Sequence, residues 1–306
     1  MFRLPIIDSA LEGFRITRER PWAVVAWAVW LLVGGPTGVL CEMLATLPGM
    51  QVLQQLPSPT SAQPEQLAAA SAAVARVWPA MLAFTAVGYG FTLVSFTAVM
   101  RAVFSPERRD RFFYLRLGPD ELRQLALAMI VLGLLLAYAV VVQLVVAAAG
   151  AAGPVAGPPL AAFLLAFAFG ALVVAALRLS LAPAATFAAR RVRLFSTWKL
   201  TRGLVWPLLG VYVSALGLAV VVFFLALVVA EGLTGLLAFA TGRGIDGMIA
   251  MLKPDTSSLP ALFSWPSVMA LVLSAAINTP IWVVTSAAGV AAYRRIAAAR
   301  GEPGAR

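Results

Sequence analysis

Residues 122–149, LRQLALAMIVLGLLLAYAVVVQLVVAAA, decide the fold class of this chain. After Arg123, no residue in the stretch carries a charge. A helix needs about 20 apolar residues to cross a hydrocarbon core of about 30 Å, and this stretch is longer than that. Its apolar residues follow one another without the apolar–polar alternation of barrel strands. The stretch therefore predicts a transmembrane helix.

Five further stretches have the same character, near residues 22–46, 79–104, 159–177, 204–230 and 266–293. The 306-residue chain is 61% hydrophobic and only 12% charged, whereas a soluble domain carries about 25% charged residues. These charges are too few to cover a water-exposed surface. The sequence predicts an all-α, polytopic membrane helix bundle with about six transmembrane helices and amphipathic interfacial helices. We expect a single integral membrane domain over residues 1–306.

Lysine and arginine are distributed unevenly among the connections. Of the 23 lysines and arginines, only Arg76, Arg243 and Lys253 fall in one of the two alternating sets of connections. The basic set of loops lies on the cytoplasmic side of membrane proteins. With an even number of spans, both termini belong to that set. We therefore expect residues 1–21 to form a cytoplasmic amphipathic segment and residues 294–306 a cytoplasmic tail, and the net charge of +10 needs no nucleic acid to explain it.

The basic connections are candidates for contact with lipids or a partner. In residues 1–21, apolar residues such as Ile7, Leu11 and Phe14 recur at helical spacing and predict a helix lying in the membrane interface. In residues 180–203, aromatic and basic residues predict one basic amphipathic helix. Two interpretations stay open: interfacial anchoring, or a docking surface for anionic headgroups or a protein partner. The candidate contacts are Arg108, Arg109, Arg111, Arg190, Arg191, Arg193, Trp198, Lys199 and Arg202.

Two spans contain helix-breaking residues near their middle. Proline removes a backbone donor and kinks a helix, and broken helices at matching depth frame binding sites in transporters. These positions are either packing kinks or the polar lining of a midplane site. They are Gly34, Gly35, Pro36 and Thr37 in the first span, and Asn278, Thr279 and Pro280 in the last.

The usual groups of enzyme active sites are scarce. The chain has no histidine and one cysteine, Cys41, and no Gly-x-x-x-x-Gly-Lys loop or Gly-x-Ser-x-Gly elbow. No span carries a central Asp, Glu or Lys, the groups that a proton-coupled transporter would need on its path. We expect no catalytic, cofactor-binding or metal-binding residue. A membrane-embedded enzyme would need polar groups to converge at an interface, and the candidates are Arg101, Asp120, Glu121 and Arg178.

Five short stretches have a distinctive pattern: residues 114–118, 121–123, 178–191, 195–203 and 293–295. They resemble a broad group of uncharacterised bacterial six-helix inner-membrane proteins, which is related to the membrane region of glycerophosphodiester phosphodiesterases. The resemblance implies a fold and a location in the bacterial inner membrane. It implies no activity, since the soluble phosphodiesterase domain has no counterpart here.

The sequence thus favours a non-enzymatic inner-membrane protein that acts as an accessory, scaffold or lipid-interacting component of the envelope. Its expected partners are membrane lipids, anionic on the cytoplasmic face, and a membrane protein, but no nucleic acid. The alternative is a transporter or channel-like protein for a neutral or lipidic substrate that uses the broken first and sixth helices.

Overall fold

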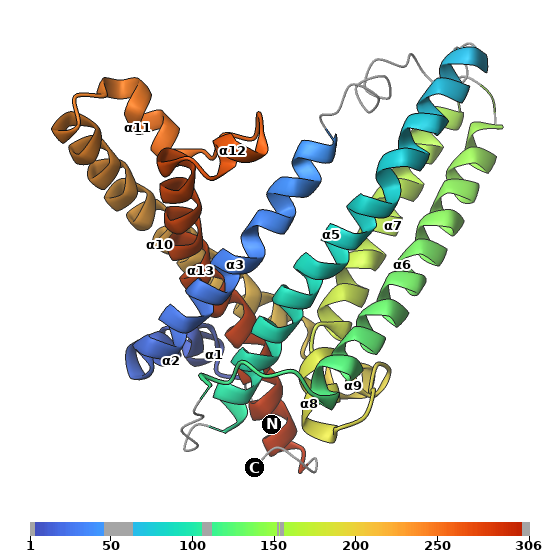
Figure 1. Ribbon diagram of the computed structural model, residues 1–306. Coiled ribbons are helices and arrows are strands. Elements are labelled where there is room, and N and C mark those ends of the chain that lie inside the picture. The colour runs from blue at the N-terminus through green and yellow to red at the C-terminus, as the bar shows by residue number, and fades with distance from the viewer. Residues whose placement is uncertain (1–3, 46–63, 106–111, 152, 154–155, 302–306) are drawn as a thin grey trace. The chain divides into compact units, whose positions relative to one another are not determined.

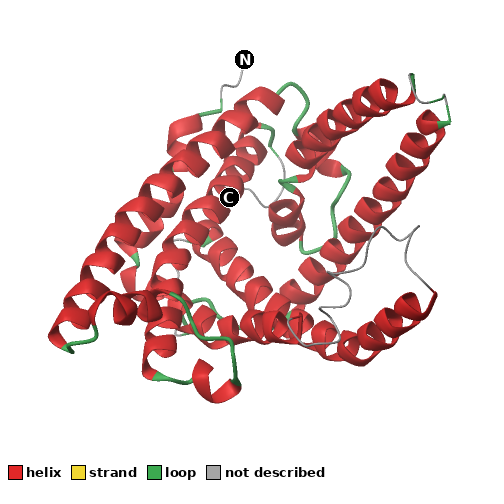
Figure 2. Cartoon of the chain, turned by 90° about the horizontal axis from the view of Figure 1, so that it is seen from above, coloured by secondary structure: helices red, strands yellow, loops and turns green. Residues whose placement is uncertain are grey.

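A computed structural model describes residues 4–45, 64–105, 112–151, 153 and 156–301. Within these ranges the regular structure is helical, without a strand (Figure 1, Figure 2). The helices are α1 (Ile6–Ala10), α2 (Glu12–Glu19), α3 (Pro21–Ala45), α5 (Pro64–Phe104), α6 (Pro119–Gly150), α7 (Gly157–Leu179), α8 (Ala182–Ala189), α9 (Ser196–Leu200), α10 (Val205–Ala240), α11 (Gly244–Leu252), α12 (Leu259–Leu262) and α13 (Trp265–Ala299).

Six of these helices, α3, α5, α6, α7, α10 and α13, are long and apolar enough to cross a membrane. Large apolar side chains cover their outer surfaces: Leu136 on α6 is 60% exposed and Phe169 on α7 is 68% exposed. Hydrocarbon chains solvate such surfaces, whereas water does not. The predicted all-α polytopic bundle is confirmed, and the chain is a multi-pass membrane protein.

The long helices extend beyond several predicted ends. α5 begins at Pro64 and not near residue 79, and α10 continues to Ala240 and not only to about residue 230. Glu231 is exposed, and Thr234 Oγ1 donates to the backbone oxygen of Ala230 at 2.8 Å, so neither polar residue interrupts α10. At 1.5 Å per residue, the 36 residues of α10 measure about 54 Å, which exceeds the hydrocarbon thickness.

The chain forms two compact units, and α5, α10 and α13 each contribute residues to both. Unit 1 comprises Met1–Glu19, Phe96–Leu218 and Val283–Arg306, and unit 2 comprises Arg20–Ser95 and Ala219–Trp282. The prediction of one membrane domain stays a prediction. Of the described lysines and arginines, unit 2 contains Arg20, Arg76, Arg243 and Lys253, and the others belong to unit 1.

In unit 1, the N-terminal segment forms two short helices that pack on longer ones. A Cβ on Gly13 of α2 would lie 2.4 Å from the Cα of Val284 of α13, so the two backbones are in direct contact. Ile6 of α1 packs against Gly210 of α10. Because Ile7 is 69% exposed, the predicted single interfacial helix is only partly right: this segment docks on the protein and leaves a smaller apolar face outside.

The connection between α7 and α10 also differs from its prediction. It contains two short helices, because α8 ends at Arg190, whose φ of 52° is left-handed. The backbone N–H of Arg193 then donates to Thr186 Oγ1 at 3.0 Å, which fixes the turn. The prediction of one basic amphipathic helix over residues 180–203 is therefore wrong.

In unit 2, the predicted helix-breaking residues do not interrupt α3 or α13. Both helices continue through their prolines, Pro36 and Pro280. Thr37 Oγ1 donates to the oxygen of Gly34 at 2.6 Å, and Thr279 Oγ1 donates to that of Ala275 at 2.7 Å. Such side-chain bonds occupy backbone carbonyls close to the prolines.

Glycines bring α3 and α5 close together in unit 2. A Cβ on Gly34 would lie 2.6 Å from the ring of Phe91, and one on Gly88 would lie 2.7 Å from Thr37 Oγ1. Trp30 adds a ring contact with Phe91, with centroids 4.6 Å apart. Gly34 and Thr37 therefore take part in the contact between α3 and α5.

Candidate anion-binding site

An arginine-lined pocket lies in unit 1, between the N-terminal helices and the last turns of α13. We call it the arginine pocket, and its volume is about 470 Å³. Gly13 makes it possible, since the close contact with Val284 holds α2 against α13. The lining residues are Asp8, Leu11, Glu12, Phe14, Arg15, Arg18, Arg294 and Arg295.

One buried carboxylate organises two of these arginines. Glu12 is only 3% exposed and pairs with Arg15, one helical turn later. Nη2 of Arg294 lies 3.9 Å from the same carboxylate oxygen. Glu12 therefore holds two guanidinium groups from helices far apart in sequence at one edge of the pocket.

Backbone and hydroxyl oxygens fix the two arginines of α13. Nη1 of Arg294 donates to the oxygen of Val103 at 2.6 Å. Nη1 of Arg295 donates to Ser9 Oγ at 2.7 Å and lies 3.3 Å from the oxygen of Pro5. A guanidinium carries five N–H donors, and within the described residues the hydrogen bonds of Arg295 use Nη1 alone. Donors thus remain for a ligand.

The arginine pocket is suited to an anion. Its four guanidinium groups face two carboxylates, one of which, Glu12, is already paired. Arg18, which also lines the pocket, is exposed. Planar guanidinium groups bind phosphate through paired hydrogen bonds. Leu11 and Phe14 add apolar surface beside these donors.

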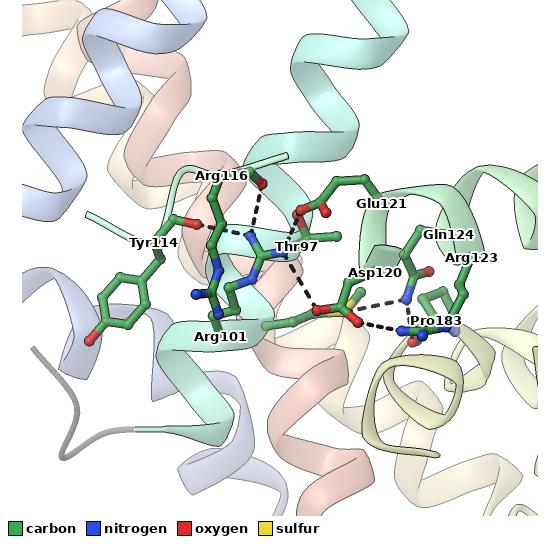
Figure 3. A network of polar contacts seen from close by, with 10 residues as sticks. Thr97, Arg101, Tyr114, Arg116, Asp120, Glu121, Arg123, Gln124 and Pro183 are labelled. Carbon is green, nitrogen blue, oxygen red and sulfur yellow. Dashed lines mark hydrogen bonds and ion pairs between the residues drawn. The ribbon is translucent and has the colours of Figure 1, made fainter. Parts of the chain in front are cut away.

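A second polar cluster in unit 1 is buried around Arg101 (Figure 3). Arg101 is 4% exposed, and its Nη2 donates to Glu121 Oε1 at 2.5 Å. Nη1 donates to the backbone oxygens of Tyr114 and Arg116, at 3.0 and 3.3 Å. Thr97 Oγ1 donates to the same oxygen of Glu121 at 2.6 Å. Arg101 therefore ties the loop before α6 to both α5 and α6.

The start of α6 supplies the acidic half of this cluster. Asp120 and Glu121 occupy its first turn, where carboxylates interact favourably with the positive end of the helix dipole. Asp120 accepts from Arg123 Nη1 at 2.7 Å. Gln124 Nε2 donates to the oxygen of Pro183 at 2.8 Å, which attaches α6 to α8 (Figure 3).

Of the four residues of the enzyme hypothesis, the structure brings together Arg101, Asp120 and Glu121. Arg178 lies instead over the ring of Trp198, 4.7 Å from its centroid. Arg101 and Glu121 are both buried and bonded to one another, so the cluster resembles a structural clamp more than an open reaction site. No group of three or more potential metal ligands occurs in the described part of the chain.

Comparisons with models of protein families, with curated proteins and with solved structures gave no match. The resemblance to the phosphodiesterase-related membrane proteins therefore stays a prediction. The function must be argued from the geometry of the two units.

The structure scatters the predicted basic contacts over unit 1. Arg190, Arg191, Lys199 and Arg202 are exposed, and Arg193 is half-buried. Lys199 and Arg202 also offer their backbone oxygens to Arg300, at 2.8 and 3.3 Å. Three further candidates, Arg108, Arg109 and Arg111, lie outside the described residues.

The sequence reasoning missed the arginine pocket as a site, although its arginines had been assigned to the basic set of connections. The pocket unites residues 8–18 with residues 294 and 295, and no spacing within one segment reveals that contact. The available signal was Gly13, a glycine within an otherwise amphipathic helix. Of the midplane candidates, Gly35, Asn278 and Thr279 line a separate cavity within unit 2.

Proposed function

We propose that this protein is a non-enzymatic, lipid-interacting membrane component that binds the phosphate of anionic lipids in the arginine pocket. The observation that carries the proposal is the convergence of Arg15, Arg18, Arg294 and Arg295 on one open pocket that includes apolar side chains. A free anion needs only the arginines, whereas a lipid also presents apolar chain to Leu11 and Phe14.

The charge distribution supports a cytoplasmic position for this site. The described lysines and arginines gather in unit 1, and basic segments at membrane interfaces attract anionic headgroups. By the positive-inside rule, the basic connections of unit 1 and both termini would lie on the cytoplasmic side. We propose the bacterial inner membrane as the location, where such a protein would serve as an accessory or scaffold and contact a membrane protein partner.

A transporter or channel-like role for a neutral or lipidic substrate is the second candidate. The cavity that Gly35, Asn278 and Thr279 line favours it. The uninterrupted course of α3 and α13 counts against it, since the hypothesis was based on broken helices.

Removing the charge of Arg18 is expected to weaken binding of an anionic lipid about fivefold. Arg18 is exposed and lines the pocket, and one basic residue near anionic headgroups contributes about 1 kcal/mol. The measurement is native mass spectrometry of the detergent-solubilised protein, titrated with a short-chain phosphatidylglycerol. The Arg18→Gln variant is compared with Arg243→Gln, whose arginine is exposed in unit 2.

Two further titrations sharpen this test. Short-chain phosphatidylcholine should bind more weakly than phosphatidylglycerol, and inorganic phosphate should compete only at much higher concentration. Arg15→Lys keeps the charge but loses the planar fork, so it should also weaken binding. Equal affinity of Arg18→Gln and the parent protein for phosphatidylglycerol would refute the site, and competition by phosphate at equal concentration would refute a lipid as its ligand.

A further inference from the structure

A second cavity lies within unit 2, between α3, α13 and the end of α11. Its volume is about 350 Å³, at the small end of the range of about 300–1,000 Å³ that is typical of ligand pockets. α3 contributes Leu31, Leu32, Gly35 and Val39. The last residue of α11, Leu252, and Pro254 beyond it form a second side, and α13 contributes Ala270, Leu271, Ser274, Ala275, Asn278, Thr279 and Trp282.

No charged side chain lines this cavity among the residues that the structure describes. A phosphate, carboxylate or ammonium group placed there would lose its hydration without a counter-charge, which is costly in a membrane. The leucines, valine, alanines and tryptophan instead suit an aliphatic chain. The lining therefore excludes the anionic ligands that fit the arginine pocket.

A pair of polar side chains on α13 gives the cavity one hydrogen-bonding position. Asn278 Nδ2 donates to the backbone oxygen of Ser274 at 2.8 Å and to its Oγ at 3.1 Å. This bond leaves Asn278 Oδ1 as an acceptor, for which the described residues supply no donor. Because Ser274 Oγ accepts from the amide, its own proton can be donated. An acceptor and a donor thus stand next to each other, one helical turn apart.

A hydroxyl group is the ligand that matches such a pair, since it donates one hydrogen bond and accepts another. Thr279 supplies no donor for it, because its Oγ1 already donates to the oxygen of Ala275 at 2.7 Å. We propose that the cavity binds a neutral membrane amphiphile with one aliphatic chain that ends in a hydroxyl, that is, a long-chain alcohol. The site is independent of the arginine pocket and of the function proposed for it.

The test uses the full-length protein in lipid nanodiscs and three photoreactive probes with the same diazirine-bearing chain. One probe ends in a hydroxyl, one in a carboxylate and one in a methyl group. The alcohol should label the peptides around Gly35 and Asn278 most strongly, and unlabelled hexadecanol should compete. Asn278→Leu removes the acceptor and should reduce the affinity for the alcohol about tenfold, while labelling by the hydrocarbon stays unchanged.

Two other variants keep the proposal falsifiable if Asn278→Leu folds poorly. Ser274→Ala removes the donor, together with the oxygen that accepts from Asn278 Nδ2, and should weaken alcohol binding about fivefold. Gly35→Leu should abolish labelling by all probes, because a Cβ there meets no atom within 4 Å and the side chain would enter the cavity. Gly133→Leu, at an equally open glycine of α6, is the matched control.

Equal labelling by the alcohol and the hydrocarbon would overturn the proposal and assign the cavity to the acyl tail of an ordinary lipid. Labelling by the carboxylate as strong as that by the alcohol would overturn the choice of a neutral ligand. Labelling that is unaffected by Gly35→Leu would place the ligand outside this cavity.

Discussion

Replacing Glu121 by glutamine is expected to lower the free energy of unfolding by about 3–5 kcal/mol. The reason is the position of Arg101, which is 4% exposed and gives its hydrogen bond at 2.5 Å to this carboxylate. Removing one partner of a buried ion pair leaves the other charge buried and unpaired, which strongly destabilises the folded state. Asp120 can offset only part of this loss, because its oxygen lies 3.7 Å from Arg101 Nη2 and its side chain is 24% exposed.

The measurement is unfolding of the protein in mild detergent, followed by circular dichroism with increasing sodium dodecyl sulfate. Arg123→Gln is the matched control in the same cluster: its side chain is 30% exposed, and loss of its bond to Asp120 should change stability by at most about 1 kcal/mol. The double variant Arg101→Met, Glu121→Leu should recover most of the loss. If Glu121→Gln unfolded at the same detergent concentration as the parent, the clamp would have no structural role.

Replacing Gly13 by alanine is expected to detach α2 from α13 and thereby abolish anionic lipid binding. The added Cβ would lie 2.4 Å from the Cα and 2.9 Å from the nitrogen of Val284. Backbone atoms cannot move aside as a flexible side chain can, and overpacking of this kind costs about 1–3 kcal/mol. Because the arginine pocket needs residues of both helices, its affinity should fall far more than the stability of the chain.

The same lipid titration measures this loss, and limited proteolysis after Arg15 and Arg18 reports whether the N-terminal helices have been released. Gly133→Ala serves as the control, since its Cβ meets open space and alanine in a helix is favoured over glycine by about 0.5–1 kcal/mol. Binding of phosphatidylglycerol by Gly13→Ala with the parent's affinity would contradict the proposed docking of α2.

The spans could be predicted from the sequence because hydrophobic length alone determines them. Residues 122–149 and 266–293 fall within α6 and α13, and only the helix ends differ. The structures of the two amphipathic segments, residues 1–21 and 180–203, were harder to predict, because single residues determine the course of the backbone there. Arg190 ends α8 in a left-handed conformation, and Gly13 allows α2 to touch α13, neither of which a periodic pattern reveals.

For the polar contacts, too, local features could be predicted from the sequence, whereas contacts between distant segments could not. Asp120 and Glu121 in the first turn of α6 could be predicted from local rules of helix ends. Their pairing with Arg101 was only one hypothesis among several, and the contact between Glu12 and Arg294 could not be derived, since nothing in either segment identifies the other. The prolines of α3 and α13 were expected to interrupt helices that in fact continue.

Accessibility of single cysteines in intact bacterial cells tests most directly how this chain crosses the membrane. After Cys41 is replaced by alanine, Arg191→Cys and Thr241→Cys each place one thiol at an exposed position, in unit 1 and unit 2 respectively. A membrane-impermeant maleimide should label the cysteine at 241 in intact cells, and the one at 191 only after permeabilisation. Labelling of both cysteines from outside, or of the cysteine at 191 alone, would contradict the assignment of the arginine-rich connections to the cytoplasmic side.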